Sequence, residues 1–520
     1  MGGEDSKFLN ECFVDTGDLQ TLRDCSDPRR IILGRTGVGK TALLTRLSEI
    51  EERTISIPPE SLALGYISNS TILNFLQQLG VKLDIFFKLL WRHVFTVELL
   101  KYHFKICNES SKVSFFSMVS NLFRDQKHKK ALAYLEDWGK SFWEETDYRI
   151  KELTTKLEAD LTESIKTRIP YISLEEQNVH KISEEQRGEI IHRAQQIVNK
   201  VQIQELSQII DLIDNVLKDP QKKYYITIDR LDENWVEDKL RYRLIRALIE
   251  TVRDFRKVRH AKIVVALRID LFNRVLQLTR DSGFQEEKYE SLYLHVEWTD
   301  KRLIELIDSR IKHLILTRHN NAQVAHIDIL PEKVSSQKTI EYILDRTIKR
   351  PREIISFFNE CIREAVNHPL FSTEIIKTAE AEYSRKRLAA LEHEWYDDYP
   401  NLKRFVAILE KRCKTFKVDE ISLDDCSELC LELVIKGFSE HDSLALCANQ
   451  VVDCTLSLVD FRKEMLRVFY LVGLIGLKFT TFEKTSWAHI ERGISMHEVS
   501  NDTLIYVHPM FWRSIGVREK

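Results

Sequence analysis

Short apolar runs alternate with amphipathic stretches along the first 300 residues of the chain. Five of these runs have the length of buried strands and little internal polarity; they cover residues 30–33, 53–57, 224–228, 262–267 and 291–296. Between them, apolar positions recur every three or four residues, which is typical of helices that bury one face. Strands that alternate with helices predict an α/β fold built on a parallel sheet.

The second and third runs are much farther apart than a single helical connection requires. The surplus is residues 105–220. Within it, apolar residues recur at helical spacing over 150–165 and again over 190–217. We expect two long amphipathic helices that pair as a coiled-coil-like hairpin and project from the sheet domain. Such an arm can pack within its own molecule or offer a platform to a partner or another subunit.

The last part of the chain has a different pattern. Residues 461–471 predict a helix, 475–482 and 503–507 predict strands, and the apolar segment after His508 opens a short helix. Helices followed by a late two-stranded ribbon indicate a winged-helix-like domain over 390–520. His508 precedes a proline, and we interpret it as a capping or core histidine.

Composition narrows the class of protein. Only 16 glycines and 10 prolines in 520 residues favour long helices over tight turns. The formal charge of −3 gives no global argument for nucleic acid binding. The most apolar stretch, 81–104, carries six Asp, Glu, Lys or Arg residues and is interpreted as a core helix rather than a membrane span. The first residues lack an apolar signal segment, and the nine cysteines follow no disulfide-like pattern. We therefore expect a cytoplasmic protein without membrane segments.

Three of the few glycines fall in the sequence GRTGVGKT, residues 34–41, between the first apolar run and a helical stretch. This strand–loop–helix setting indicates a P-loop, whose backbone N–H groups surround phosphates. Lys40 supplies a positive charge for the β- and γ-phosphates, and Thr41 offers a hydroxyl to Mg²⁺. The residues expected to hold ATP are Gly34, Arg35, Thr36, Gly37, Val38, Gly39, Lys40, Thr41 and Ala42.

A P-loop enzyme also needs acidic groups. The run 224–228 ends at Asp229, which we expect to hold Mg²⁺ together with Thr41. Asp232 and Glu233 follow, and either can orient and deprotonate the attacking water. Asp232 fits a D-x-x-D arrangement, whereas glutamate is the residue type used more widely, so the sequence leaves the choice open.

Two further groups of cations are candidates for phosphate contacts. Arg268 follows the fourth apolar run, where ligands of parallel sheets bind, and is a candidate sensor of the γ-phosphate. The alternative is a structural arginine paired with Asp270 or Asp229.

The sequence KRPRE at residues 349–353 opens a helix with three cations at its N-terminus, against the helix dipole. Arg350 and Arg352 are therefore predicted to meet phosphates, either of the bound nucleotide or of another subunit's nucleotide. The alternative is that they are solvated or paired with Asp345 and Glu353.

The set GRTGVGKT, ITIDRLDE, VVALRID and KRPREIISFFNEC, in this order, resembles bacterial P-loop ATPases of the STAND and KAP type, relatives of AAA+ proteins within the RecA-like class. The resemblance covers about residues 8–365. It implies a RecA-like core, a helical lid over the nucleotide and an ATP-driven switch that oligomerises, often in anti-phage defence. KAP proteins usually carry membrane segments between the two Walker motifs, which this chain lacks.

The segments that we expect are an NTPase core in two parts, 1–104 and 221–300, the insertion 105–220, the lid 301–389 and the C-terminal domain 390–520.

The predicted function is an ATPase that uses ATP and Mg²⁺, forms a homo-oligomer and controls a separate effector or trigger protein. One alternative is a DNA-binding ATPase that places its winged helix on the duplex. Another is a module that holds nucleotide without turnover. The cysteines at 426, 430, 447 and 454 are expected to be buried free thiols rather than a zinc site, because their spacing is wrong for one.

Overall fold

The computed structural model describes thirteen stretches of the chain. They are residues 11–61, 71–104, 155, 158–163, 184–233, 235–279, 286–316, 324–368, 370–396, 398–436, 442–480, 482–488 and 496–518. The chain divides into two compact units. We call Asp15–Glu297 the P-loop unit, and Met1–Val14 together with Trp298–Lys520 the C-terminal unit.

The P-loop unit is built on a five-stranded parallel sheet with the order β2-β3-β4-β1-β5. All five predicted strands are present; they are β1 (Ile31–Gly34), β2 (Thr54–Ser56), β3 (Tyr224–Ile228), β4 (Ala261–Arg268) and β5 (Tyr293–His295). The glycine loop follows β1 and Asp229 follows β3, with β4 between these two strands. This is the RecA-like arrangement of P-loop NTPases, which confirms the predicted fold class.

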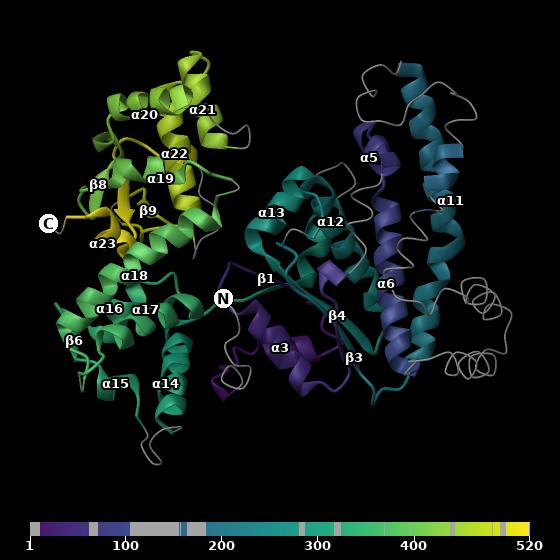
Figure 1. Cartoon of the computed structure of the whole chain (residues 1–520), viewed down its shortest axis with the longest axis horizontal. Helices are drawn as coiled ribbons and strands as arrows, with labels where there is room; N and C mark the ends of the chain where they lie inside the picture. Colours follow the sequence, from purple (N-terminus) through teal and green to yellow (C-terminus); the bar gives the residue numbers. More distant parts are fainter. Residues whose placement is uncertain are drawn as a thin grey trace. The chain divides into compact units, whose positions relative to one another are not determined.

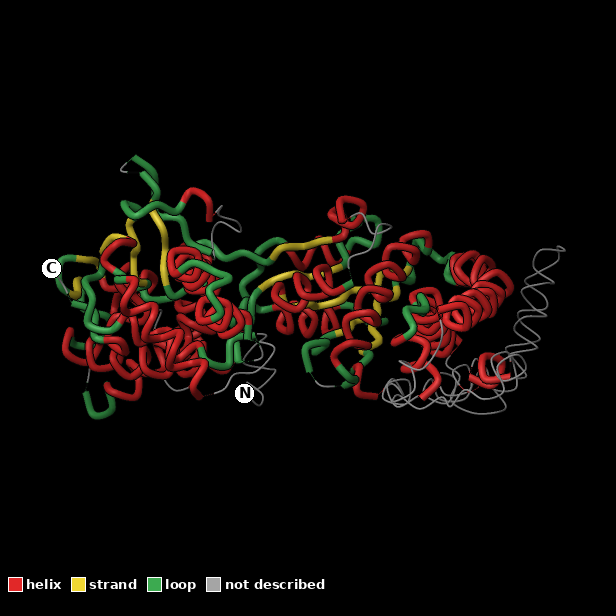
Figure 2. The backbone as a smooth tube through the Cα atoms, turned by 90° about the horizontal axis from the view of Figure 1, so that it is seen from above, coloured by secondary structure: helices red, strands yellow, loops and turns green. Residues whose placement is uncertain are grey.

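Helices cover both faces of this sheet. Figure 1 shows α3 on one side and α12 with α13 on the other. The α-helices described in this unit are α2 (Asp18–Arg23), α3 (Lys40–Ile50), α5 (Thr71–Gln78), α6 (Asp84–Phe104), α11 (Glu184–Val216), α12 (Asp238–Asp254) and α13 (Ile269–Leu278). Short 3-10 turns are η1 (Pro59–Ser61), η3 (Phe255–Lys257) and η4 (Glu286–Leu292). In the view of Figure 2 the strands run between layers of helix.

The insertion contains one of the predicted long helices. Helix α11 has 33 residues and lies alongside α6, as Figure 1 also shows. The predicted first helix, 150–165, lies mostly outside the described residues, although Leu161 is fully buried in the core of the unit. Within the described residues, α11 packs mainly against α6, a helix of the predicted core segment 1–104, and it also contacts η3.

The C-terminal unit begins with helices and ends with a small sheet. Its elements are α14 (Asp300–Leu316), α15 (His326–Ile329), β6 (Lys333–Val334), β7 (Gln337–Lys338), α16 (Thr339–Asp345), α17 (Pro351–Glu364), α18 (Thr373–Glu394), α19 (Leu402–Val406), η5 (Ala407–Leu409), β8 (Thr415–Lys417), η6 (Val418–Glu420), α20 (Leu423–Lys436), α21 (Ser443–Val452), α22 (Leu458–Val472), β9 (Ile475–Lys478), η7 (Met496–Glu498), β10 (Leu504–Val507), η8 (Pro509–Phe511) and α23 (Trp512–Ile515). Helix α18 runs through the predicted lid boundary at 389.

The late strands form the predicted winged-helix-like domain. The sheet is antiparallel with the order β8-β10-β9, so it holds a third strand that the sequence pattern did not reveal. Helices α20, α21 and α22 lie between β8 and β9 in the chain. Helix α22 ends at Gly473, whose φ of 90° lets the chain turn into β9.

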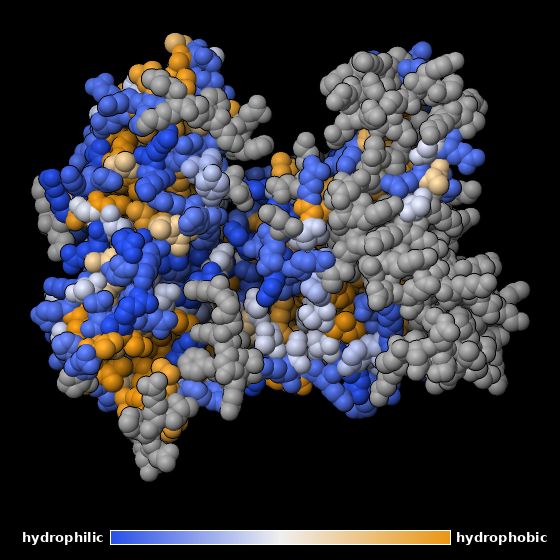
Figure 3. All heavy atoms as spheres, viewed as in Figure 1, coloured by the Kyte–Doolittle hydropathy of each residue, from blue (hydrophilic) through white to orange (hydrophobic). Residues whose placement is uncertain are grey.

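The visible surface is mostly hydrophilic, with smaller hydrophobic areas (Figure 3). Among the helices in the described stretches, none is both long and apolar enough to cross a membrane.

Candidate functional site

The glycine loop makes a tight turn between β1 and α3. Gly37 and Gly39 have φ values of 79° and 103°, a region that favours glycine. At Gly34 a Cβ would stand 2.6 Å from Val38 Cγ1, so a larger residue there would force the Val38 side chain to move. The glycines are therefore required by the shape of a loop that turns N–H groups inward at a helix N-terminus.

Lys40 lies across this loop. Its Nζ donates hydrogen bonds to the carbonyl oxygens of Gly34, at 2.9 Å, and of Arg35, at 3.1 Å. Burial lowers the pKa of Lys40 to about 8, and the nearby carboxylates of Asp232 and Asp229 oppose that shift. The ammonium group is thus held where a phosphate in the loop would meet it.

Thr41 and Asp229 meet at the carboxyl end of the sheet. Thr41 Oγ1 donates to Asp229 Oδ2 at 2.7 Å, and Asp229 Oδ1 accepts from the Arg230 amide at 2.9 Å. Arg230 has the left-handed φ of 59°, which turns the chain sharply after β3. A hydroxyl and a carboxylate side by side are oxygen ligands of the kind that Mg²⁺ takes. The residues present therefore fit the predicted magnesium site.

Arg268 is the last residue of β4 and pairs in register with Gly34, the first residue of the loop. Its Nε and NH2 lie 3.1 and 2.6 Å from the two oxygens of Asp270, and its NH1 lies 3.3 Å from Asp232 Oδ2. The structure thus brings Lys40, Arg268 and Asp232 together at one edge of the sheet. Of the two pairings suggested by the sequence, it contains the one with Asp270.

Glu233 has a different environment from Asp232. A hydrogen bond with the carboxyl of Glu60 and partial burial raise the pKa of Glu233, and Arg230 opposes the shift. Glu60 lies in η1, just after β2. Sequence analysis missed Glu60 because its place beside Glu233 depends on β2 lying next to β3.

Arg350 and Arg352 belong to the C-terminal unit, so their phosphate contacts stay a prediction. Arg350 is buried, and its NH1 lies 3.8 Å from Glu394. Glu353, suggested as a partner for these cations, instead forms an ion pair with Arg387 at 2.7 Å.

His508 and the cysteines at 426 and 430 are buried in the C-terminal unit. His508 Nδ1 accepts from the Met510 amide at 3.2 Å, and burial lowers its pKa to about 3, so it caps η8 as a neutral ring. Cys426 and Cys430 are buried free thiols, as predicted, and burial raises the pKa of Cys430 to about 12. Cys447 and Cys454 are also free thiols, but Cys447 is only half-buried and Cys454 is exposed, so the predicted burial was wrong for these two. No cluster of three or more His, Cys, Asp or Glu residues suited to a metal occurs in the described part of the chain.

Comparison with known proteins gives one match to a family model and one to a curated protein. Residues 301–392 match a family described as the FunZ-associated C-terminal helical domain. The chain is 21% identical over 526 residues to the putative transposon gamma-delta 80.3 kDa protein of Escherichia coli. That match covers 99% of this chain but 66% of the relative, so the chain spans about two thirds of the relative's length.

Two solved structures have a remote likeness. The Walker-type ATPase PABY2304 of Pyrococcus abyssi gives a TM-score of 0.37 at 12% identity, over 97% of this chain and 95% of that one. The Aeropyrum pernix ORC2 protein, in ADPNP-ADP complexes, gives 0.34 at 11% identity, over 98% and 95%. TM-scores of this size carry no functional argument, and the proposal below is supported by the chain's own residues.

Proposed function

We propose that this chain binds ATP with Mg²⁺ at the loop between β1 and α3 and hydrolyses it. The observation that carries the proposal is the convergence of four elements. The glycine loop and Lys40 suit phosphates, Thr41 with Asp229 suits a magnesium ion, and Asp232 lies beside Arg268. Bound Mg²⁺ would neutralise charge on the β- and γ-phosphates.

The chain's own groups divide the work of hydrolysis. Loop amides and Lys40 hold the phosphates in line and stabilise charge as the terminal phosphoryl group leaves. Asp232 is placed to orient a water and accept its proton, because it stands next to the arginine expected to meet the γ-phosphate. Glu233 is the weaker candidate, since its carboxyl is engaged with Glu60.

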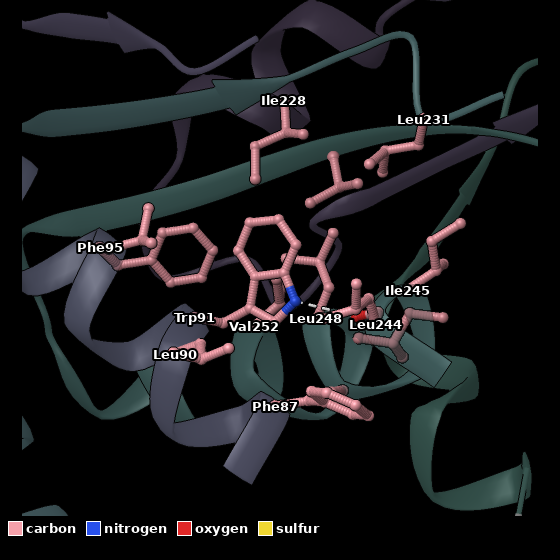
Figure 4. Packing of buried hydrophobic residues seen from close by; sticks show 14 of the residues in the cluster. Phe87, Leu90, Trp91, Phe95, Ile228, Leu231, Leu244, Ile245, Leu248 and Val252 are labelled. Carbon is pink, nitrogen blue, oxygen red and sulfur yellow. Dashed lines mark hydrogen bonds between the residues drawn. The ribbon is translucent and has the colours of Figure 1, made fainter. Parts of the chain in front are cut away.

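We further propose that the nucleotide state acts as a switch for self-assembly or for a separate effector. The STAND and KAP resemblance supports this role, and anti-phage defence is its expected setting. Helix α6 offers a route by which the nucleotide site can be coupled to the rest of the unit. Its Trp91 packs between Ile228 of β3 and Leu244 of α12, close to the loop that follows β3 (Figure 4).

DNA binding is the second candidate, and the winged-helix-like sheet is the observation that favours it. Helix α22, which precedes the β9–β10 ribbon, carries three cations. Arg462 is buried and donates to Ile421 O, and Arg467 is paired with Glu464 at 2.5 Å. With Lys463 as the remaining cation, this helix is a poor match for phosphate contacts.

The test is phosphate release from Mg-ATP by the full chain. We expect Lys40→Ala to reduce the rate at least about 100-fold. Asp229→Asn should lower the rate and raise the Mg²⁺ concentration that hydrolysis needs. Lys223→Ala, which removes an exposed lysine next to β3, is the matched control and should retain the wild-type rate. A wild-type chain that binds and turns over no ATP would contradict the proposal.

The switch is tested by mass measurement in solution with ADP, with ATP, and with Lys40→Ala plus ATP. We expect a larger mass only for the wild type with ATP. An unchanged mass in all three samples would favour a module that holds or hydrolyses nucleotide without assembling.

A further inference from the structure

Asp270 is a carboxylate next to the proposed site that neither hydrolysis nor magnesium binding requires. It stands in the first turn of α13, two residues after Arg268. Its two oxygens bind Nε and NH2 of Arg268 in a fork, at 3.1 and 2.6 Å. A bidentate pair of this kind fixes the plane of a guanidinium group.

The fork leaves NH1 of Arg268 pointing toward the site. That nitrogen lies 3.3 Å from Asp232 Oδ2, a longer contact than either of the two to Asp270. The side chains of Arg268 and Asp270 are 22% and 25% exposed, whereas that of Asp232 is 38% exposed. The contact with Asp232 is therefore the weaker of the two, and NH1 is the part of the guanidinium that a ligand can take over.

The position of Arg268 indicates that this ligand is a terminal phosphate. Arg268 pairs with Gly34 across β1 and β4, so it stands beside the mouth of the loop. The charges of Asp232, Asp229, Arg268 and Asp270 all act on the ammonium of Lys40. A γ-phosphate carries more negative charge than the single carboxylate of Asp232, and ADP has no such group.

We propose that Asp270 is a positioning residue that makes the site prefer ATP over ADP. Its carboxylate holds the Nε and NH2 groups of Arg268. NH1 then exchanges its contact with Asp232 for a contact with the γ-phosphate, while the bidentate pair with Asp270 stays intact. The same exchange frees Asp232 to bind the attacking water only when a triphosphate is present. This inference rests on the proposed ATP site and adds to it a residue that discriminates between the two nucleotides.

The experiment measures the affinities of the full chain for Mg-ATP and Mg-ADP by calorimetry. We expect Asp270→Asn to weaken ATP binding about tenfold, with the ADP affinity within twofold of wild type. Arg268→Ala should give the same loss, and the double variant should lose no more than Arg268→Ala alone, because both changes remove one interaction.

The chain offers a matched control in Asp27 and Arg29. This pair is also bidentate, with distances of 3.0 and 2.6 Å, but it precedes β1, at the other end of the strand from the glycine loop. Asp27→Asn should leave both affinities unchanged. If Asp270→Asn proves too unstable, Arg268→Lys is the second variant. It keeps the charge but cannot form the bidentate pair with Asp270, and it should show the same selective loss of ATP affinity.

The outcomes separate this inference from the proposed function. A wild-type chain that binds neither nucleotide overturns the proposed function itself. Binding of both nucleotides with equal affinity by the wild type, or an equal loss of both in Asp270→Asn, overturns only the role of Asp270. An Asp270→Asn variant that retains the wild-type preference for ATP over ADP also overturns only the role of Asp270.

Discussion

Two arginine–carboxylate clusters, one in each unit, lie in opposite environments. In the P-loop unit, Arg268, Asp232 and Asp270 are partly exposed at the sheet edge. In the C-terminal unit, Arg346 and Glu380 are only 7% and 3% exposed, and they lie 2.6 Å apart. An ion pair open to solvent can trade its partner at little cost, whereas a buried one cannot without leaving a charge unpaired. The difference indicates which pairs are available to a ligand and which hold helices together.

The buried pairs of the C-terminal unit extend over several helices. Glu380 of α18 also accepts from Tyr342 of α16 at 2.6 Å, and Arg513 of α23 lies 3.4 Å from it. One turn farther along α18, Tyr383 donates to Glu353 of α17 at 3.1 Å. These contacts join α16, α17 and α18 to α23, so we expect these four helices to move as one body.

The largest effect is expected from breaking a buried pair. Glu353→Gln removes the partner of Arg387 in a fully buried place, and it should reduce the free energy of unfolding by about 3–5 kcal/mol. Glu382→Gln on the surface of α18 is the control and should change it by less than about 0.5 kcal/mol. Chemical denaturation measures both, and equal effects would contradict the distinction between buried and exposed pairs.

The exposed carboxylates should matter for rate rather than for stability. Asp232→Asn should lower the single-turnover rate of ATP hydrolysis about 100-fold or more, with little change in ATP affinity or in unfolding. Glu233→Gln should lower the rate only a few-fold, since Glu233 faces Glu60. The reverse order of the two variants would assign the base to Glu233.

Lys40 is intermediate between the buried ion pairs and the exposed carboxylates, because it is both charged and largely desolvated. With a pKa lowered to about 8 by burial, the free chain loses the proton as the pH rises past 8. Bound phosphate favours the ammonium form, so ATP affinity should fall about tenfold from pH 7 to pH 9. Calorimetry at pH 8.5 in buffers of different ionisation heat should record proton uptake on binding. Binding without proton uptake would exclude the lowered pKa.

The smallest effect concerns a buried contact that carries no charge. Trp91 Nε1 donates to Leu244 O at 2.9 Å, between α6 and α12 (Figure 4). Trp91→Phe should cost about 1–2 kcal/mol of unfolding free energy, because it loses one neutral hydrogen bond and leaves a small void. Thermal unfolding measures it. A loss as large as that of Glu353→Gln would mean that burial matters more than charge.

Sequence periodicity predicted the strands of the P-loop unit, because buried parallel strands are continuous apolar runs such as IVVAL in β4. The glycine loop was predicted from its own motif, GRTGVGKT, and Asp229 from its place at the end of an apolar run. Strand β8 was missed because its sequence, TFK, has a single buried apolar residue between two polar ones. The fork of Asp270 on Arg268 and the contact of Glu60 with Glu233 depend on rotamers and strand neighbours, which periodicity does not contain.

The order of strands in the sheet also has a consequence for synthesis on the ribosome. Ile31 of β1 pairs with Val265 of β4, and β2 can pair with β3 only after the whole insertion has been synthesised. About 230 residues must therefore emerge before the strand that carries the glycine loop gains its first described neighbour. During that interval its apolar edge is exposed, so the nascent chain is expected to depend on chaperones far more than the finished protein.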